Sequence, residues 1–322
     1  MREEVHYLDR SDYPKWDSLV QASPQGAVSS LSWWLEALGS NTRVLGYFEN
    51  GRLVAGIPLH RERMFGITIY RKPKLTYPWG VIIEPLAGKT SSVTTRKMHI
   101  LDNLAKSLAQ IKGSIIVSFH PSLENWLPFY WHGFCVSLGI THVIENLDRI
   151  DHVRKELTSD ARRLISKAID SGIIVEPCGF QEGMNLFRQS YRKQHRRLPY
   201  SDDYFRRLYA AAKAHDAGEC FVARDREGQA HAANFAIWDR ERAYGIASGT
   251  DLTPGNGSAG TLLMWHMIEF AAAHTKTFDF CGTTMPSIEH FLRSFGARQE
   301  SYPRVLKLSL LPRLCWSALR MI

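Results

Sequence analysis

The chain has 322 residues, of which 44% are hydrophobic and 22% are charged. These values are typical of a globular protein and exclude a disordered or fibrous chain. The length predicts two domains, and the net charge of +8 favours an anionic partner without identifying one.

The positive charge is concentrated in one part of the chain. Residues 149–213 contain fourteen Lys and Arg residues but only eight Asp and Glu residues, so this segment alone has a net charge of +6. The remaining chain has a net charge of only +2. We therefore expect an anion to bind near this segment.

The start of the chain, the lack of a long apolar run and the cysteines predict an intracellular protein. The first residues lack the basic and apolar regions of a signal peptide, and no apolar run is long enough to span a membrane. We therefore predict a cytoplasmic location. The five cysteines are widely spaced and form no CxxC pair, so we expect them to be reduced and mostly buried rather than catalytic.

The first half of the chain predicts short helices, a hairpin, a long helix and further strands. Asn50-Gly51 lies between two apolar runs, a strong indication of a two-residue hairpin turn. Gly39 follows an apolar helical pattern, as is common at helix ends. The expected elements are helices around Trp16 and 31–38, strands 43–48 and 53–59, extended segments 68–70 and 79–83, a helix 92–112, a strand 115–119, a short helix 124–130 and a strand 141–144.

The second half repeats this order. Apolar residues from Leu157 to Ile169 recur at helical spacing, with Ser159 available as the N-cap and Gly172 just beyond the end. Asp202 is expected to cap a later helix. The expected elements are helix 157–169, strand 173–175, helices 181–196 and 202–215, strands 220–223, 230–238 and 243–249, helix 259–274, strand 277–280, helix 287–294 and strand 304–308.

The repeated order favours duplication of one α/β unit with mixed sheets over a single doubly wound sheet, because strict βαβ alternation is absent. We place the boundary between residues 146 and 155. The predicted domains are residues 1–150 and residues 151–309, and the second domain is expected to carry the active site. Residues 310–322 would form a tail that packs on the first domain, or an amphipathic segment that contacts an anionic membrane.

Several short motifs resemble those of the FemABX proteins. They include Ser30-Leu31-Ser32-Trp33-Trp34, Tyr77-Pro78-Trp79-Gly80 and Phe278-Asp279-Phe280-Cys281-Gly282, the last followed by Phe291-Leu292-Arg293-Ser294-Phe295-Gly296. FemABX proteins are tandem GNAT-fold acyltransferases, and related proteins occur in exopolysaccharide biosynthesis. The resemblance covers nearly the whole chain and implies two GNAT-like domains.

The resemblance also implies a reaction. It indicates transfer of an acyl or aminoacyl group to an amine of an anionic peptidoglycan or polysaccharide precursor. The implied co-substrate is acyl-CoA or aminoacyl-tRNA, which makes tRNA a candidate partner, with no metal and no tightly bound cofactor. Family members often carry Lys where this chain has Leu292, with Arg293 beside it, and this departure weakens the aminoacyl-tRNA alternative.

Asp279 and Arg293 are the candidate catalytic residues. Asp279 lies between two phenylalanines on a short strand, so its side chain should point away from theirs. There it would accept a proton from the attacking amine or orient it. Alternatively, Asp279 caps the next helix or pairs with an arginine.

An arginine-rich helix face is the candidate acceptor site. Arg188, Arg192, His195 and Arg196 are spaced to share one face of the helix expected over 181–196. Arginine binds phosphate or carboxylate with two parallel hydrogen bonds. We take Arg192, Arg196 and Tyr204 as substrate-binding candidates; the alternative is a solvated helix face.

Three glycines form the candidate donor phosphate site. Gly255, Gly257 and Gly260 match GxGxxG and precede a predicted helix, whose first N–H groups would bind phosphate. The alternative is a plain flexible loop. Tyr244 and Trp79 are further substrate-lining candidates, although both also fit wall or core positions.

The sequence lacks the GxSxG, HExxH and P-loop motifs. This absence favours direct aminolysis, in which the protein positions an activated carbonyl next to an amine. An acyl-CoA-dependent N-acyltransferase acting on a sugar or small metabolite, and a non-catalytic GNAT-like binding protein, remain alternatives.

Overall fold

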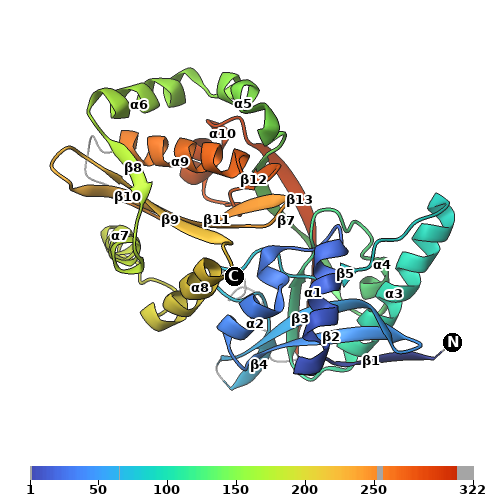
Figure 1. Ribbon diagram of the computed structural model, residues 1–322. Helices are drawn as coiled ribbons and strands as arrows, with labels where there is room; N and C mark the ends of the chain where they lie inside the picture. The colour runs from blue at the N-terminus through green and yellow to red at the C-terminus, as the bar shows by residue number, and fades with distance from the viewer. Residues whose placement is uncertain (1, 65, 252–256, 310–322) are drawn as a thin grey trace. The chain divides into compact units, whose positions relative to one another are not determined.

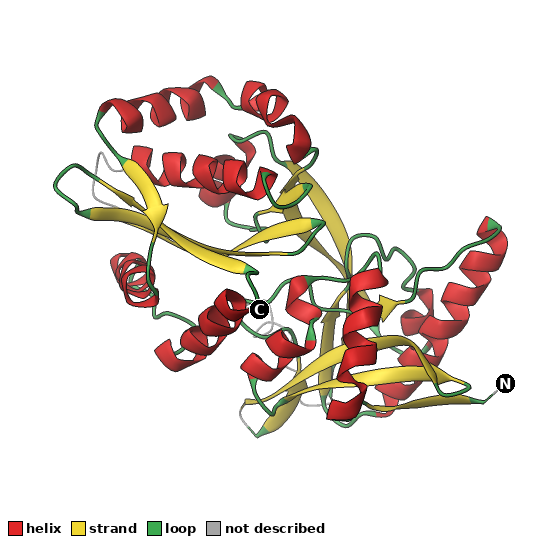
Figure 2. Cartoon of the chain, viewed as in Figure 1, coloured by secondary structure: helices red, strands yellow, loops and turns green. Residues whose placement is uncertain are grey.

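The computed structural model describes residues 2–64, 66–251 and 257–309 (Figure 1). The chain divides into two compact units. Of the described residues, the first unit comprises 2–139 and 301–309, and the second comprises 140–300. Figure 2 shows that each unit combines helices with a sheet of mixed strand direction.

The first unit has the strand order β1-β2-β3-β4-β6-β13, with β5 paired to β3. Ala55 and Ile57 on β3 contribute to the core shared with α3, whereas the backbone of Gly56 approaches the indole of Trp16 on α1. Because side chains alternate along a strand, α1 and α3 cover opposite faces of this sheet. The elements are β1 (Glu3–Tyr7), α1 (Tyr13–Ala22), α2 (Ser32–Leu38), β2 (Thr42–Glu49), β3 (Arg52–Met64), β4 (Ile67–Tyr70), β5 (Ile82–Ile83), α3 (Thr90–Gln110), β6 (Ser114–Ser118) and α4 (Leu127–Trp131), with 3-10 turns at Arg10–Asp12 and Val28–Ser30.

The second unit has the strand order β7-β12-β11-β10-β9-β8. Helices α6 and α9 cover one face of the sheet, and α7 and α8 cover the other (Figure 1). The elements are β7 (Cys135–Ile144), a 3-10 turn (Leu147–Arg149), α5 (Ile150–Glu156), α6 (Ser159–Asp170), β8 (Ile174–Pro177), α7 (Phe180–Lys193), α8 (Asp202–Ala214), β9 (Gly218–Arg224), β10 (Ala230–Trp238), β11 (Arg242–Thr250), α9 (Gly257–Ala272), β12 (Thr277–Asp279) and α10 (Pro286–Arg293). The last strand, β13 (Arg298–Lys307), begins in the second unit and continues into the sheet of the first.

The two halves of the chain exchange their last strands. In the first unit β4 pairs with β6 in parallel, and β13 then pairs with β6 in antiparallel orientation. In the second unit β11 and β12 form the parallel pair, and β7 pairs with β12 in antiparallel orientation. Each sheet is therefore completed by a strand from the other half of the sequence.

This exchange moves the domain boundaries that the sequence predicted. Residues 301–309 belong to the first unit rather than to the second, because β13 pairs with β6. The second unit begins at Ile140, about ten residues before the predicted boundary, because the end of β7 pairs with β12. The predicted tail, residues 310–322, lies outside the described residues.

Local sequence patterns account for most element positions. Asn50 and Gly51 both have positive φ, which a type I′ turn requires, and they join β2 to β3 as predicted. Gly39 ends α2 with φ of 96°. Strand β1, which pairs with β2, was not among the predicted elements.

The predicted helix caps differ by one residue from those observed. The helix expected from Leu157 begins at Ser159, and the Thr158 side chain accepts a hydrogen bond from the Ala161 N–H. Likewise, Ser201 rather than Asp202 caps α8, by accepting from the Tyr204 N–H. In both cases a hydroxyl one residue earlier satisfies a free helical donor.

We expect V305A to destabilise the first unit, although Val305 lies 166 residues after Gly139. Val305 is fully buried in the core that contains α3 and β6. Its truncation should cost about 2 kcal/mol of unfolding free energy, and limited proteolysis should show earlier cleavage within residues 90–118. The exposed Ile174 on β8 offers a control, I174A, with little effect. Earlier cleavage within residues 140–300 of V305A would contradict this assignment of β13.

Candidate functional site

The parallel strands β11 and β12 pair for only three residues and then separate. Their paired residues run from Arg242 and Thr277 to Tyr244 and Asp279, where β12 ends. Strand β11 continues to Thr250, and among the described residues this later part pairs only with β10. The opposite edge of β11 therefore presents backbone N–H and C=O groups that a ligand carrying amides can use.

A β-bulge lies where the strands separate. The register between β10 and β11 shifts between Phe235 and Ala236, which pair with Ala247 and Gly245 respectively. Ile246 is the extra residue on β11. A bulge increases the local twist and turns backbone groups out of the regular ladder, and bulges are frequent beside active sites.

Helix α9 begins shortly after β11, at Gly257. A Cβ atom at Gly257 would meet no atom within 4 Å, and one at Gly260 would only touch the Thr250 side chain at 3.4 Å. The first N–H groups of this 16-residue helix have no intrahelical acceptors and favour an anion. Gly255, the third predicted phosphate-binding glycine, lies outside the described residues.

Asp279 is completely buried in a network of hydrogen bonds. Its carboxylate accepts from the Thr141 hydroxyl, from the Cys281 N–H at 2.7 Å and from Arg242 Nη1 at 2.9 Å. Arg242 also pairs with Glu300 at 3.1 Å. Burial raises the pKa of Asp279, whereas Arg242 and the donated hydrogen bonds lower it; these three donors are the partners of an ionised carboxylate.

This arrangement corrects the predicted role of Asp279. No part of the side chain is exposed, so it cannot touch an acceptor amine in this conformation. Of the alternatives, pairing with an arginine is the one observed. The strand alternation was correctly predicted, but the sequence did not indicate that Arg242 fills the space beside it.

Two predicted substrate-lining aromatics are also core residues. Tyr244 is 1% exposed, and burial raises the pKa of its phenol well above the usual value. Trp79, in the first unit, is likewise 1% exposed and forms a bridge with the Ser118 backbone. Neither side chain presents a surface to a substrate.

The predicted arginine face is broken by the end of α7. The helix ends at Lys193, and His195 has a φ of 55°, so Arg196 leaves the helix direction. Arg192 and Arg196 are exposed, and within the described part of the chain neither has an acidic partner. The Arg196 guanidinium lies 5.9 Å from the Tyr191 ring centre.

Ion pairs fix the surroundings of these arginines. Arg188 pairs with Asp202 on α8, so it is occupied. Lys193 pairs with the buried Asp251, which directly follows β11. This pair holds the end of α7 against the end of β11. Tyr204 is half-buried, and its ring centre lies 6.5 Å from that of Tyr200.

The region of α10 differs from the prediction in two ways. Leu292, at the position where the FemABX proteins that the sequence resembles often carry lysine, is 5% exposed and belongs to the core of the second unit. Arg293 is exposed and pairs with Glu289 at 3.2 Å. Its guanidinium therefore lies at the surface of the second unit rather than in a buried site. The candidate catalytic role of Arg293 stays a prediction.

The sequence did not indicate two buried polar side chains in this unit, His142 and Asn234. Both ring nitrogens of His142 lack a hydrogen-bond partner among the described residues, and Nε2 lies 4.0 Å from Glu289 Oε1. The buried Asn234 amide oxygen, near Gly245, is also unpartnered. A lone histidine or asparagine in a strand has no distinguishing pattern, so only the fold could identify these residues.

The cysteines are mixed in exposure rather than mostly buried. Cys178 and Cys220 are buried with their sulfurs 3.3 Å apart, and the hydrogen bond with Cys178 together with burial raises the pKa of Cys220. Cys281 is partly exposed and Cys135 is exposed. The protonated thiol of Cys220 is unsuited to nucleophilic catalysis. Cys315 lies outside the described residues.

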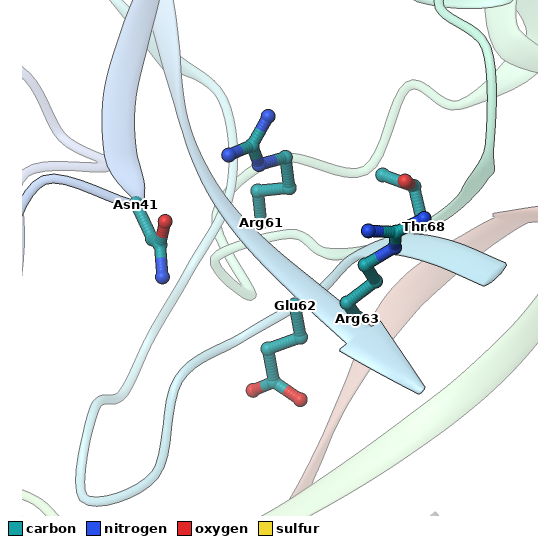
Figure 3. A pocket seen from close by; sticks show the side chains of 5 residues that line it. All are labelled: Asn41, Arg61, Glu62, Arg63 and Thr68. Atoms are coloured by element: carbon teal, nitrogen blue, oxygen red, sulfur yellow. The ribbon is translucent and has the colours of Figure 1, made fainter. Parts of the chain in front are cut away.

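The first unit contains a polar cavity of about 450 Å³ at the β3–β4 hairpin. In Figure 3, Arg61 and Arg63 project from β3, and Glu62 points the other way. Glu62 pairs with Arg71, 2.6 Å away. The cavity is lined by Asn41, Arg61, Glu62, Arg63 and Thr68.

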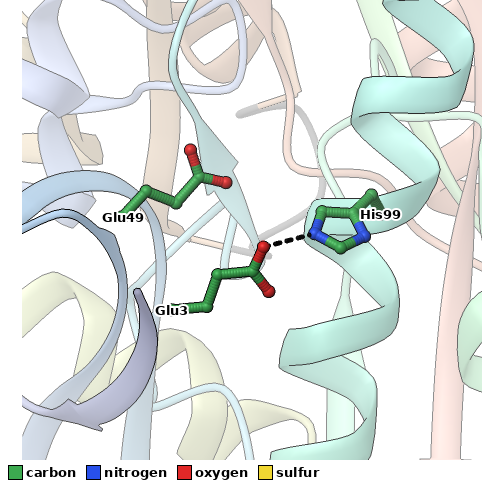
Figure 4. A group of neighbouring side chains, drawn as sticks. All are labelled: Glu3, Glu49 and His99. Atoms are coloured by element: carbon green, nitrogen blue, oxygen red, sulfur yellow. Dashed lines mark hydrogen bonds and ion pairs between the residues drawn. The ribbon is translucent and has the colours of Figure 1, made fainter. Parts of the chain in front are cut away.

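A group of potential metal ligands also lies in the first unit. Within the described part of the chain, Glu3, Glu49 and His99 bring three ligand atoms within 4.8 Å of one another (Figure 4). However, Glu49 already accepts hydrogen bonds from Arg96 and Tyr47, and Glu3 bonds to His99 at 2.9 Å. Each of the three side chains therefore already has a hydrogen-bond partner within the protein.

Comparison with known proteins identifies the fold. Residues 152–290, most of the second unit, match a family model described as the acetyltransferase (GNAT) domain. The crystal structure of FemX superposes with a TM-score of 0.72 and 12% sequence identity, covering 96% of this chain and 98% of that chain. The chain has a tandem GNAT fold.

Other solved structures agree with this conclusion. A tandem GNAT protein from the clavulanic acid biosynthesis pathway has a TM-score of 0.57 at 13% identity, covering 95% of this chain and 98% of its own. L-PGS from Bacillus licheniformis has a TM-score of 0.57 at 10% identity, with 96% of each chain covered. No curated protein matches the sequence.

The tandem GNAT architecture predicted from the FemABX resemblance is thus confirmed, as is the expected class of enzyme, an acyltransferase. The GNAT match falls on the half of the chain that was expected to carry the active site. Among the described helices, none is both long and apolar enough to cross a membrane.

We expect D279N to destabilise the protein rather than to remove a catalytic base. Loss of one charge from a buried pair should cost about 3–5 kcal/mol of unfolding free energy. The exposed pair Glu145–Arg298 provides the control, because E145Q should cost less than about 1 kcal/mol. Chemical denaturation measures both. An unchanged D279N stability with a large loss of kcat would restore the catalytic role.

Proposed function

We propose that the protein transfers a carrier-activated acyl group to an amine by direct aminolysis. The observation that carries this proposal is the separation of the parallel strands β11 and β12 beside the start of α9. The free edge of β11 offers backbone hydrogen bonds to an extended ligand, and the start of α9 offers N–H groups to a phosphate. A phosphorylated carrier with an extended, amide-containing arm has both features.

The reaction places the acyl carbonyl near the bulge of β11. There, backbone N–H groups would stabilise the negative oxygen of the tetrahedral intermediate. The amine nitrogen forms a bond with the carbonyl carbon, and the bond from that carbon to the carrier's sulfur or oxygen breaks. Positioning of the two reactants supplies much of the rate enhancement, and no enzyme nucleophile is needed.

Exposed positive charge at the end of α7 supports a phosphate-bearing substrate. The Lys193–Asp251 pair holds the end of α7 next to the end of β11, and Arg192 is the neighbouring residue. Arg192 and Arg196 therefore offer two guanidinium groups for an anionic acceptor, while the first N–H groups of α9, at Gly257 and beyond, serve the donor phosphate.

The donor is acyl-CoA or an aminoacyl-tRNA. The burial of Leu292 favours acyl-CoA, because the position where FemABX relatives carry lysine offers no basic group here. The clavulanic acid pathway protein is described in a form without AcCoA, and another similar structure is the C-terminal domain of a putative lysylphosphatidylglycerol synthetase. The first of these names mentions a CoA donor, and the second names no donor.

The acceptor that we propose is an amine on an anionic cell-wall or polysaccharide precursor. A sugar or small metabolite is the second candidate, favoured by the same Leu292 observation. Both proposed donors are cytoplasmic molecules, so we place the reaction in the cytoplasm. Contact with the inner membrane surface would bring the enzyme to a lipid-linked acceptor.

A donor-by-acceptor assay tests this function. Purified protein is incubated with labelled acetyl-CoA, longer acyl-CoAs or a pool of charged tRNAs, each with aminosugars or peptidoglycan precursors. Amide product from acyl-CoA alone selects the CoA route, and product only with charged tRNA selects the other. If no donor gives product and none raises the melting temperature, the protein is a non-catalytic GNAT-like protein.

We expect the double variant R192A/R196A to raise the KM for an anionic acceptor about tenfold while kcat changes less than threefold. Each lost charge-assisted contact weakens binding without touching the reacting atoms. R163A is the matched control, because Arg163 is exposed in the same basic segment and pairs with Asp160. Steady-state kinetics at two salt concentrations provide the measurement. Equal KM values for wild type and double variant would refute this assignment.

A further inference from the structure

His142 is a buried polar side chain whose ring makes no hydrogen bond. It is 2% exposed on β7, and both ring nitrogens lack a partner among the described residues. Buried polar groups are nearly always hydrogen-bonded, because an unpaired donor or acceptor loses its contacts with water without compensation. A leucine would fill such a position at lower cost. The imidazole therefore needs an explanation other than packing.

The position of His142 points to the acyl-transfer site. Its backbone carbonyl accepts a hydrogen bond of 2.9 Å from the N–H of Phe280, the residue that directly follows β12. His142 thus lies beside the end of β12, where β11 and β12 separate. Ile144, which points to the same face of β7 as His142, packs in the core with α9 and α10 residues.

Glu289 on α10 is the acidic group nearest the ring. Its Oε1 atom lies 4.0 Å from His142 Nε2 and 3.2 Å from Arg293 Nε. The Glu289 side chain is 35% exposed, so its carboxylate is accessible to a ligand. The distance of 4.0 Å exceeds a hydrogen bond, and catalytic contacts often shorten only when substrate is bound.

We propose that Glu289 binds the acceptor amine and receives its proton, and that His142 and Arg293 position this carboxylate. The inference rests on the proposed acyl transfer and adds the group that handles the nucleophile. A carboxylate attracts amines and ammonium groups, so the acceptor class is a primary amine. Glu289 touches the substrate and is the catalytic residue; His142 acts through it.

The proton transfers balance as follows. The acceptor nitrogen attacks as the free amine, and one of its protons moves to Glu289 Oε2 as the C–N bond forms. The bond from the carbonyl carbon to the carrier's sulfur or oxygen breaks, and that atom takes a proton from solvent. The Glu289 carboxyl then returns its proton to solvent.

The stability of H142L separates a functional histidine from a structural one. Because His142 makes no hydrogen bond, H142L should leave the melting temperature unchanged or raise it. His60 is the matched control, because it is also buried but bonds to the Thr42 hydroxyl at 2.8 Å. H60L should lower the melting temperature by about 3 °C or more. This measurement requires no substrate. A fall for H142L as large as that for H60L would overturn the proposal.

Kinetics of the active enzyme then test the roles. We expect H142L to lower kcat about 100-fold with little change in the acceptor KM, and E289Q to lower kcat and raise that KM. Added imidazole should raise the kcat of H142A at least tenfold above its value without imidazole. E241Q is the surface control, because Glu241 pairs with Lys276 and both side chains are exposed. A kcat within threefold of wild type in H142L or E289Q would overturn the proposal.

The two proposals fail in different ways. If wild-type protein gives no product with any donor, the acyl-transfer function fails, and the role of Glu289 in that reaction fails with it. If wild type is active but the H142L and E289Q variants are equally active, only the assignment of Glu289 and His142 fails.

Discussion

The second unit depends on the buried ion pair between Arg242 and Asp279. Arg242 is the first residue of β11, and Asp279 is the last residue of β12. Thr141 on β7 and Glu300 on β13 complete the network. The pair therefore joins four strands at the point where β11 and β12 stop pairing. Removal of either charge would leave the other buried without its partner, which is why such a pair fixes the geometry so firmly.

This network lies between the part of the sheet where β11 and β12 are paired and the part where they are not. Before Tyr244 and Asp279 the two strands share a ladder, and beyond them β11 continues without β12. The bulge at Ile246 and the first turn of α9 both follow Tyr244 in the sequence, after the point where β11 stops pairing with β12. Asp279 thus contributes to the proposed function by shaping the site rather than by reacting. The unpartnered ring of His142 lies next to this rigid junction, where an unsatisfied polar group can be held in place.

Local chemistry explains which features the sequence could predict. The Asn50-Gly51 turn, the glycine at the end of α2 and the helix around Trp16 follow from short-range rules, and each is observed. The repeated order of elements also predicted two similar units. The exchange of β7 and β13 could not be predicted this way, because it depends on pairing between residues that are far apart in sequence.

The site was harder to predict than the fold for the same reason. The prediction that Arg192 and Arg196 share one helix face was wrong. Helix α7 ends at Lys193, and His195, two residues later, adopts a left-handed conformation. The alternation around Asp279 was correct, but its role depended on Arg242, which is distant in sequence. Glu289 and His142 carry no local pattern at all. Periodicity shows which way a side chain points, whereas chemistry depends on what the rest of the chain places opposite.

The central claim is that an acyl donor binds along β11 and at the start of α9. Amide hydrogen exchange, measured by mass spectrometry with and without saturating acyl-CoA or aminoacyl-tRNA, tests this most directly. The account predicts slower exchange in peptides that cover residues 245–250 and 257–262, with little change in the first unit. Donor binding that leaves both segments unprotected, or that protects only residues of the first unit, would contradict it.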